Sequence, residues 1–206
     1  MKIGICTAIP DIGKVEKFGF DYMESSVTGT ASMDEEKFAD AVRAVEGSGL
    51  ECEAFNGLFP GDIRLTGPDV DPDGIRGYLE KAFSRISRLG AKIAVFGSGG
   101  ARRIPEGWDR EDAWKQLIDA AEIVGDVAAS YDLTVVMEPL NRKETNVLNS
   151  VEEGFRFVRD VNQPNIRLLA DFYHMRVEKE NMDILVKTAS VLRHLHIANS
   201  HGRVYP

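Results

Sequence analysis

The chain lacks several features that would assign it to particular protein classes. Its 206 residues include only two cysteines, Cys6 and Cys52, too few for a disulfide framework, and we expect both to be buried, reduced thiols. No apolar stretch approaches the roughly 18 residues of a membrane span, and the N-terminus has no long apolar signal segment. We therefore expect a cytoplasmic protein with no membrane partner.

Clusters of basic residues are also missing. Lys and Arg number 25 against 33 Asp and Glu, which gives a formal net charge of −8, and the basic residues are scattered along the chain. Binding to nucleic acid needs clustered Lys and Arg to neutralise phosphates, so we expect no nucleic-acid partner. A glycine-rich nucleotide-binding turn is missing too, because the segment after the first predicted strand, Cys6-Thr-Ala-Ile-Pro10, contains no glycine.

What the chain does contain is an alternation of strand and helix patterns along its length. Short, largely apolar runs predict strands at 2–6, 22–26, 50–55, 92–96, 133–138, 166–171 and 192–198. Helical periodicity predicts helices at 11–18, 34–48, 72–89, 110–130, 150–161 and 182–190. Asp71 and Gly90 are the start and stop signals of the third helix. This rhythm is typical of a parallel sheet covered by helices, either open and doubly wound or closed into a barrel.

Three consecutive predicted strands, the fifth to the seventh, carry a metal-binding residue type at or near their ends. These residues are Glu138, Asp171 and His196. Each alone has a plainer interpretation, such as an ion-paired carboxylate for Glu138 or a helix N-cap for Asp171. Together they indicate one site, because neighbouring parallel strands present their carboxyl ends at one edge. In a β/α barrel that edge is the catalytic face, so we favour a barrel and a metal-dependent enzyme.

The barrel interpretation leaves one strand unaccounted for. A (β/α)8 TIM barrel has eight strands and typically about 250 residues. We therefore interpret residues 1–206 as a single α/β barrel domain from which the eighth βα unit is missing. Because seven strands leave two edges of the sheet unpaired, we expect the protein to continue beyond Pro206.

The donor set indicates both the kind of metal and the kind of reaction. Two carboxylates and one imidazole suit Mn²⁺, Mg²⁺ or Co²⁺, with Zn²⁺ as a further candidate. Such a site leaves positions open for substrate oxygens and can stabilise the enediolate formed when a proton leaves the carbon next to a carbonyl. A carboxylate at that carbon would be the general base. We therefore expect proton abstraction and return on a polyol or ketose.

Four segments resemble the xylose isomerase-like TIM barrels, in particular the ketose 3-epimerases and related sugar or sugar-phosphate isomerases. They are Phe96-Gly-Ser-Gly-Gly-Ala-Arg102, Glu138-Pro-Leu-Asn-Arg-Lys-Glu144, Asp171-Phe-Tyr-His174-Met175 and His194-Leu-His196-Ile-Ala198, in family order. The resemblance implies that Glu138, Asp171 and His196 are metal ligands and that Glu138 is also a catalytic acid/base. It places a fourth ligand, a Glu that is the second acid/base, beyond Pro206.

The resemblance also implies which residues contact the substrate. His174 and Glu144 match the substrate-binding His and Glu of the family, and Arg203 lies one residue further on than the family arginine. The implied partner is a small sugar or sugar phosphate. A homo-oligomer is also expected, because barrels of this group commonly pair.

Several other polar residues have two interpretations each. Glu24 is either a further polar residue at the barrel rim or a partner in an internal salt bridge. His194 shares a strand face with the ligand histidine two residues on, and we expect it to be a hydrogen-bonded residue of the interior. Arg102 and Arg103 either bind a phosphate or form an ion pair at a helix end, and we favour the ion pair. His201 is expected in a loop.

Other functions fit the same barrel. A keto-polyol dehydratase begins with the same enolisation and then expels a hydroxide. A barrel that binds sugar without turnover would follow if the fourth ligand were truly missing. A DNA-repair enzyme of the endonuclease IV type is disfavoured, because it uses several metals and more histidines than the four present here, and because the chain is acidic.

Overall fold

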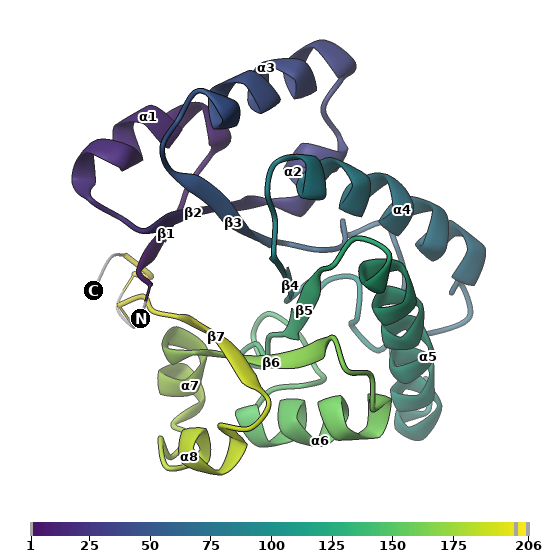
Figure 1. The fold of residues 1–206 in the computed structure, drawn as a ribbon. Helices are drawn as coiled ribbons and strands as arrows, with labels where there is room; N and C mark the ends of the chain where they lie inside the picture. Colours follow the sequence, from purple (N-terminus) through teal and green to yellow (C-terminus); the bar gives the residue numbers. More distant parts are fainter. Residues whose placement is uncertain (1, 200–201, 205–206) are drawn as a thin grey trace.

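The computed structural model of the chain describes residues 2–199 and 202–204. Its strands form one parallel sheet in chain order. They are β1 (Gly4–Cys6), β2 (Tyr22–Ser26), β3 (Glu51–Asn56), β4 (Ile93–Phe96), β5 (Thr134–Met137), β6 (Ile166–Asp171) and β7 (Leu192–His196). Within the described residues, β1 pairs with β2 alone and β7 with β6 alone. The sheet therefore curls into a half-barrel of seven parallel strands, as the sequence predicts (Figure 1).

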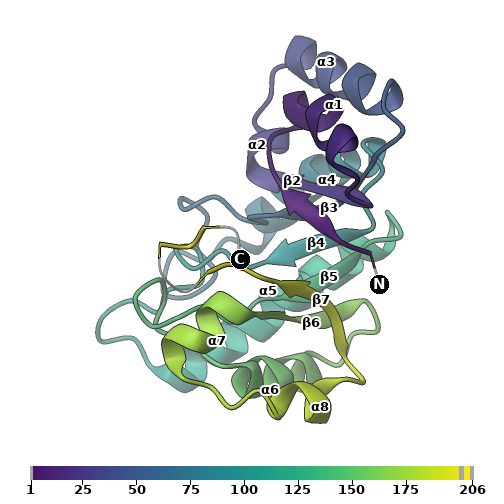
Figure 2. The same cartoon turned by 90° about the vertical axis from the view of Figure 1, so that its left-hand side faces the viewer.

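Helices cover the convex face of this sheet (Figures 1 and 2). They are α1 (Ile12–Val15), α2 (Val27–Ala31), α3 (Glu35–Glu46), α4 (Pro72–Arg88), α5 (Arg110–Ala129), α6 (Val151–Val161), α7 (Phe172–Glu178) and α8 (Ile184–Thr188), with 3₁₀ turns η1 (Ile9–Asp11) and η2 (Glu16–Phe18) on either side of α1. Among the described residues, no helix has the length and apolar character needed to cross a membrane.

The longer helices begin and end where local sequence signals place them. The Asp71 side chain accepts a hydrogen bond from the Gly74 N–H at 3.1 Å and caps α4, whose first residue is Pro72. Gly90 follows α4 with φ of +92°, a conformation that favours glycine. Both predicted signals are confirmed. The short helices α2 and α7 were not predicted, because each starts directly at a strand end with no intervening loop.

The strands separate a large outer core from a small inner one. On β5, Val135 and Met137 are buried with the residues of the covering helices. Val136 points to the opposite face, because strand side chains alternate, and packs there with Val95 and Leu169. The inner face of the sheet thus carries an apolar layer at mid-strand, below the strand ends where the predicted site residues lie.

The two cysteines have different environments. Both are free thiols, and Cys52 is buried as expected. The prediction that Cys6 is buried is wrong, because it lies on the edge strand β1 and is exposed. His201 and Pro206, which carry the loop expectation and the end of the sequence, lie outside the described residues.

Candidate active site

The strand register brings the predicted metal ligands to one edge of the sheet. Asp171 is the last residue of β6 and lies opposite His196, the last residue of β7. Glu138 follows the last residue of β5, and its N–H donates to the carbonyl oxygen of Phe96 on β4 at 3.2 Å. All three side chains therefore start from the carboxyl ends of adjacent strands, which is the catalytic edge of a β/α barrel.

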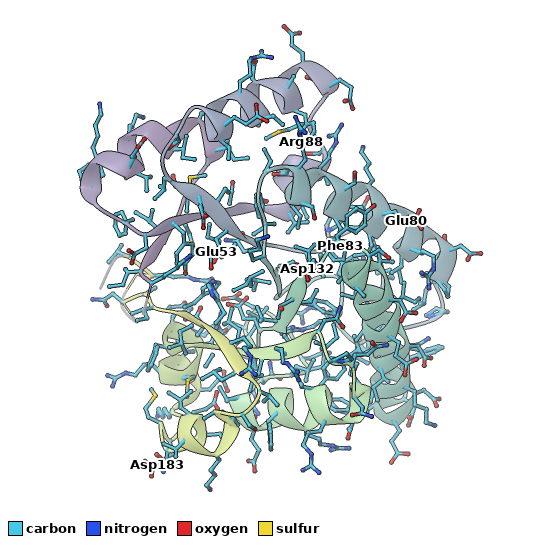
Figure 3. All side chains as sticks on the ribbon, viewed as in Figure 1. Glu53, Glu80, Phe83, Arg88, Asp132 and Asp183 are labelled. Carbon is cyan, nitrogen blue, oxygen red and sulfur yellow. The ribbon has the colours of Figure 1, made fainter. Side chains whose placement is uncertain are left out.

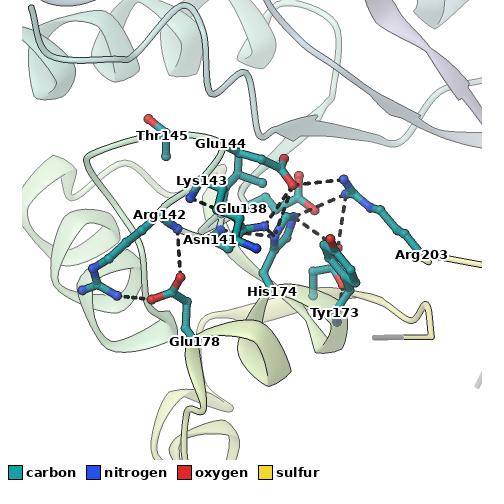
Figure 4. Close-up of polar contacts among 12 residues, drawn as sticks. Glu138, Asn141, Arg142, Lys143, Glu144, Thr145, Tyr173, His174, Glu178 and Arg203 are labelled. Atoms are coloured by element: carbon teal, nitrogen blue, oxygen red, sulfur yellow. Dashed lines mark hydrogen bonds and ion pairs between the residues drawn. The ribbon is translucent and has the colours of Figure 1, made fainter. Parts of the chain in front are cut away.

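Their side chains meet through two separate contacts. His196 Nδ1 lies 3.0 Å from Glu138 Oε1. His174 Nε2, from the first turn of α7, lies 3.5 Å from Asp171 Oδ2. One donor atom each from Glu138, Asp171 and His174 lie within 4.8 Å of one another. The structure thus groups His174, and not the predicted His196, with the two carboxylates; Figure 4 shows Glu138 beside His174. His196 contacts Glu138, but its donor atom falls in a second group with Cys6 and Glu24, also within 4.8 Å of one another.

The electrostatics of these residues fit a divalent cation. Burial raises the pKa of the Asp171 carboxyl, and the negative charge of Glu138 raises it further. Burial also acts to raise the pKa of Glu138, but the hydrogen bond from His196 outweighs it and the pKa is lowered. Two buried carboxylates that repel each other, flanked by imidazoles, form a donor set that a divalent ion would neutralise. Glu138, Asp171 and His174 therefore form a group that could hold a metal ion.

The carboxylates beside His196 favour the protonated form of its ring. Burial acts to lower the pKa of its imidazole, but hydrogen bonds to Glu138 and Glu24 raise it well above the ordinary value. The ring lies between these two carboxylates. His174 differs, because burial lowers its pKa despite the neighbouring carboxylates. The two histidines therefore have opposite charge preferences.

A loop residue that the sequence did not single out orients His174. The backbone N–H of Asn141 donates to His174 Nδ1 at 3.2 Å. The Asn141 side chain donates to Glu144 Oε1 at 2.9 Å (Figure 4). Asn141 thus links two of the predicted substrate-binding residues. The sequence signal that could have identified Asn141 is its position in the segment from Glu138 to Glu144, which resembles the xylose isomerase-like barrels.

The third predicted substrate-binding residue lies beside the other two. Arg203 Nη1 is 3.3 Å from Glu144 Oε1, and Arg203 Nη2 is 3.3 Å from His174 Nε2. Its guanidinium also lies over the Tyr173 ring at 4.8 Å from the centroid (Figure 4). Glu144 and Arg203 are partly exposed, with side-chain exposures of 35% and 47%. They line the accessible side of the cluster, whereas Glu138 and Asp171 form its buried side.

Arg102 adopts neither of the arrangements considered for it. Its side chain is fully buried, and its Nη2 donates to the carbonyl oxygen of Glu138 at 2.9 Å. Nη1 points to the carbonyl oxygen of Phe96 at 3.3 Å. Neither a bound phosphate nor the favoured helix-end ion pair is consistent with this position, because the guanidinium is enclosed by backbone carbonyls. Arg103 donates to the carbonyl oxygen of Glu144 at 2.8 Å.

Glu24 and His194 are internal residues of the same region. Glu24 is 2% exposed and accepts hydrogen bonds from both His194 and His196, so its interpretation as an internal partner is confirmed. Burial acts to raise the pKa of Glu24, but these hydrogen bonds lower it. His194 is buried and hydrogen-bonded, as expected. No local signal in the sequence indicates that Glu24, on the second strand, reaches the seventh strand.

Comparison with known proteins identifies the family. The sequence profile of the xylose isomerase-like TIM barrels matches residues 12–206. The chain belongs to this family. Its predicted site residues lie at the carboxyl ends of parallel strands. The resemblance noted in the sequence is thereby confirmed.

Relatives within the xylose isomerase-like TIM barrels are named as epimerases. D-psicose 3-epimerase of Agrobacterium fabrum is 27% identical over 205 residues, covering 95% of this chain and 68% of that protein. The 3-dehydro-D-guloside 4-epimerase of Escherichia coli is 31% identical over 196 residues, covering 91% and 72%. This chain thus spans roughly two thirds of the length of its relatives.

The solved structures agree with this family fold. A D-psicose 3-epimerase crystallised in the presence of D-fructose superposes with a TM-score of 0.84 at 23% identity, covering 97% of this chain and 74% of that one. At this identity the match establishes the fold. The half-barrel of seven strands therefore corresponds to most of a complete family barrel.

Proposed function

We propose that this protein is a divalent-metal-dependent sugar epimerase of the ketose 3-epimerase type. The observation that carries the proposal is the position of Glu138, a buried carboxylate at the catalytic edge. It lies in contact with His196 and is grouped with Asp171 and His174. Membership of a family whose named relatives are epimerases supports the same conclusion.

The named relatives share one chemical requirement, which we extend to this chain. A ketose 3-epimerase inverts the carbon next to the C2 carbonyl, and a 3-dehydro sugar 4-epimerase inverts the carbon next to the C3 carbonyl. In both cases the proton that is removed lies beside a carbonyl group and is acidified by it. The active site therefore needs a base at that carbon and positive charge near the carbonyl oxygen.

Each residue of the cluster has a role in this reaction. Glu138, Asp171 and His196 would hold a Mn²⁺, Mg²⁺ or Co²⁺ ion, which polarises the carbonyl when bound. Glu138 has a lowered pKa, so it is ionised at neutral pH and can accept the proton. His174 and Glu144 orient substrate hydroxyl groups, and Arg203 lies on the accessible side, where a sugar would enter.

Inversion also needs a second proton-transfer group on the opposite face of the sugar. The resemblance to ketose 3-epimerases assigns this role to a Glu outside residues 1–206. Glu138 alone accounts for removal of the proton and for its exchange with solvent. Exchange at the carbon next to the carbonyl is therefore the most direct readout of the proposed function.

The test is proton exchange catalysed by the full-length protein in D₂O. The protein is loaded with Mn²⁺ and incubated with a ketohexose or with a 3-keto glycoside, and deuterium incorporation is followed by NMR. We expect Glu138→Gln to reduce the exchange rate by about 10²–10⁴-fold, the usual contribution of a general base. Glu152→Gln, which removes an exposed carboxylate in the first turn of α6, should leave the rate unchanged.

Three results would contradict the proposal in different ways. Exchange that persists in Glu138→Gln would show that another group is the base. A product that lacks one hydroxyl group would identify a dehydratase. Mn²⁺ binding and sugar binding without exchange in the full-length protein would indicate a barrel that binds sugars without turnover.

A further inference from the structure

Glu24 makes an unusually complete set of contacts for a carboxylate on the inner face of a sheet. It projects from β2 and is 2% exposed. Its Oε2 lies 2.9 Å from His194 Nε2 and 3.1 Å from His196 Nε2. Its Oε1 lies 3.0 Å from His196 Nε2 and accepts from Asn56 Nδ2 at 2.8 Å. Both oxygens of one buried carboxylate are therefore engaged by side chains of β3 and β7.

The ring of His196 lies between this carboxylate and Glu138. Nε2 faces Glu24, and Nδ1 faces Glu138 Oε1 at 3.0 Å. A histidine that binds a metal through one nitrogen keeps a proton on the other, and a hydrogen bond to that proton fixes the tautomer and the ring orientation. In this geometry the proton belongs on Nε2, so Nδ1 is the nitrogen directed to the metal-binding side.

We propose that Glu24 is the positioning residue of the metal site, holding His196 through its Nε2–H so that Nδ1 is presented to the ion. This inference rests on the proposed metal-dependent function. It adds a residue from the N-terminal half of the chain to a site whose ligands lie on β5 to β7. Glu24 and His196 also lie with Cys6 in a group of possible donor atoms within 4.8 Å of one another. In the proposed arrangement Glu24 acts through His196 and is not itself a ligand; ligation of the ion by His196 Nε2, on the side of Glu24, would contradict this.

The surrounding contacts explain why Glu24 can hold a ring in one orientation. Asn56 donates to Oε1 and limits rotation of the carboxylate about its terminal bond. His194 donates to Oε2 from the neighbouring position on the same face of β7, 5.1 Å from the His196 ring between centroids. Because both of these partners belong to strands, the carboxylate is fixed by regular backbone and not by a loop.

The experiment measures Mn²⁺ affinity in the metal-free, full-length protein by calorimetry. Glu24→Met keeps an unbranched side chain of similar length and removes both acceptor oxygens. Glu24→Gln keeps one acceptor oxygen and removes the charge. Outer residues that orient a metal ligand usually contribute about 10–100-fold in affinity. We expect Glu24→Met to weaken Mn²⁺ binding by that factor and Glu24→Gln to weaken it less.

Two control variants separate the positioning of His196 from the effects of losing a nearby negative charge and of disturbing the buried network. Glu53 lies on the neighbouring strand β3 (Figure 3) and pairs with Lys2. Glu53→Gln removes one negative charge there and should change the affinity by less than about twofold. His194→Gln disturbs the same buried network but leaves the contact between Glu24 and His196 intact. It should lower the free energy of unfolding of the metal-free protein while changing Mn²⁺ affinity by less than about threefold.

A second readout follows the tautomer directly. In Zn²⁺-loaded protein with ¹⁵N-labelled histidine, the parent should show metal-bound Nδ1 and protonated Nε2 at His196. In Glu24→Met, the His196 signals should no longer correspond to one tautomer with metal on Nδ1 and the proton on Nε2. Metal on Nε2 in the parent would overturn the inference whatever the affinities are.

The outcomes distinguish the inference from the function on which it rests. If the parent binds Mn²⁺ and Glu24→Met binds it as tightly as Glu53→Gln does, Glu24 is a structural residue and the inference fails alone. If the folded parent binds no divalent ion, the proposed metal-dependent function fails and this inference fails with it. The inference is supported if Mn²⁺ binding is weakened in Glu24→Met and not in His194→Gln, and if His196 binds the metal through Nδ1 in the parent.

Discussion

On the inner face of the sheet, two layers lie one above the other on the same strands. Val136 and Leu169 are completely buried and pack with Val95 at mid-strand. Two residues further along β5 and β6, the corresponding positions are Glu138 and Asp171. Side chains two residues apart on a strand share a face, so the change from apolar to acidic occurs within one step of the alternation.

The two layers of the inner face contribute differently, because the apolar residues stabilise the fold and the acidic residues form the candidate site. The apolar layer gains from burial and needs no partner to be stable. In the acidic layer, burial raises the pKa of Asp171 and the negative charge of Glu138 raises it further, so the ionised form of Asp171 opposes folding. A residue that opposes folding is retained where a ligand requires it. Substitutions in the apolar layer should therefore lower the free energy of unfolding and spare Mn²⁺ affinity, and substitutions in the acidic layer should do the reverse.

The largest loss of stability is expected in the apolar layer. Leu169→Ala should lower the free energy of unfolding by about 2–5 kcal/mol, because it leaves a cavity where the side chain was completely buried. Denaturant unfolding measures this loss. Mn²⁺ affinity of the folded fraction should stay within about threefold of the parent. Val186→Ala, at an 81% exposed position on α8, is the control and should change stability by less than about 0.5 kcal/mol.

Arg102 is a fully buried polar residue outside the inner face, and it gives the second largest effect. Arg102→Met removes the donors to the carbonyl oxygens of Phe96 and Glu138, of which the Phe96 oxygen keeps the Glu138 N–H at 3.2 Å. A buried acceptor left without a donor costs about 1–3 kcal/mol, so we expect a loss of about 2 kcal/mol in unfolding experiments. Arg103→Met, next in the chain but exposed, should lose less than about 1 kcal/mol. Equal losses of unfolding free energy in Arg102→Met and Arg103→Met would show that the buried arginine contributes no more to stability than the exposed one.

In the acidic layer the expected change in stability has the opposite sign. Asp171→Asn removes a charge that faces Glu138, while the amide oxygen can still cap α7, where Asp171 now accepts from the Tyr173 N–H at 2.7 Å. The free energy of unfolding of the metal-free protein should be unchanged or higher, and Mn²⁺ affinity should fall by at least about tenfold. Asp183→Asn, at an exposed position (Figure 3), should change neither quantity. Clear destabilisation by Asp171→Asn would contradict the division into layers.

The smallest change is expected at the accessible side of the site. Arg203→Lys should leave the free energy of unfolding within about 0.5 kcal/mol of the parent, because the ion pair with Glu144 is partly exposed. Lysine cannot reproduce the planar contact with Tyr173, so KM for the substrate should rise severalfold with a smaller change in kcat. Steady-state kinetics beside Arg193→Lys, an exposed substitution on β7, checks this. An unchanged KM would exclude a substrate contact by Arg203.

The elements that the sequence predicts well are those with strong local signals. Strands β2 and β6 have the predicted bounds, and α4 has its predicted cap at Asp71, because hydrophobic runs and capping residues act over a few positions. Helix α7 was missed, although Asp171 had been considered as an N-cap, because the helix begins at the residue after the strand. The placement of Glu138, Asp171 and His196 at one edge of the sheet was predictable because parallel strands align their ends.

The remaining features depend on contacts between distant segments. The sequence does not show that Arg102 enters the core, since a charged residue after a glycine turn usually stays exposed. Nor does it show that Asn141 reaches His174 or that Glu24 reaches His196, because each contact depends on loop conformation or on the curvature of the sheet. Curvature arises from the packing of every strand together and has no local signature.

The contact between Glu24 and His194 also has a consequence for the order of folding. The two residues are 170 positions apart in the chain, so they meet only after the intervening strands have paired. Contacts of such long sequence separation are slow to form. His196 should therefore acquire its final orientation late, after the helices and the neighbouring strand pairs are in place. Recovery of tight Mn²⁺ binding during refolding would then lag behind recovery of helical circular dichroism, and the metal would report completed assembly of the barrel interior.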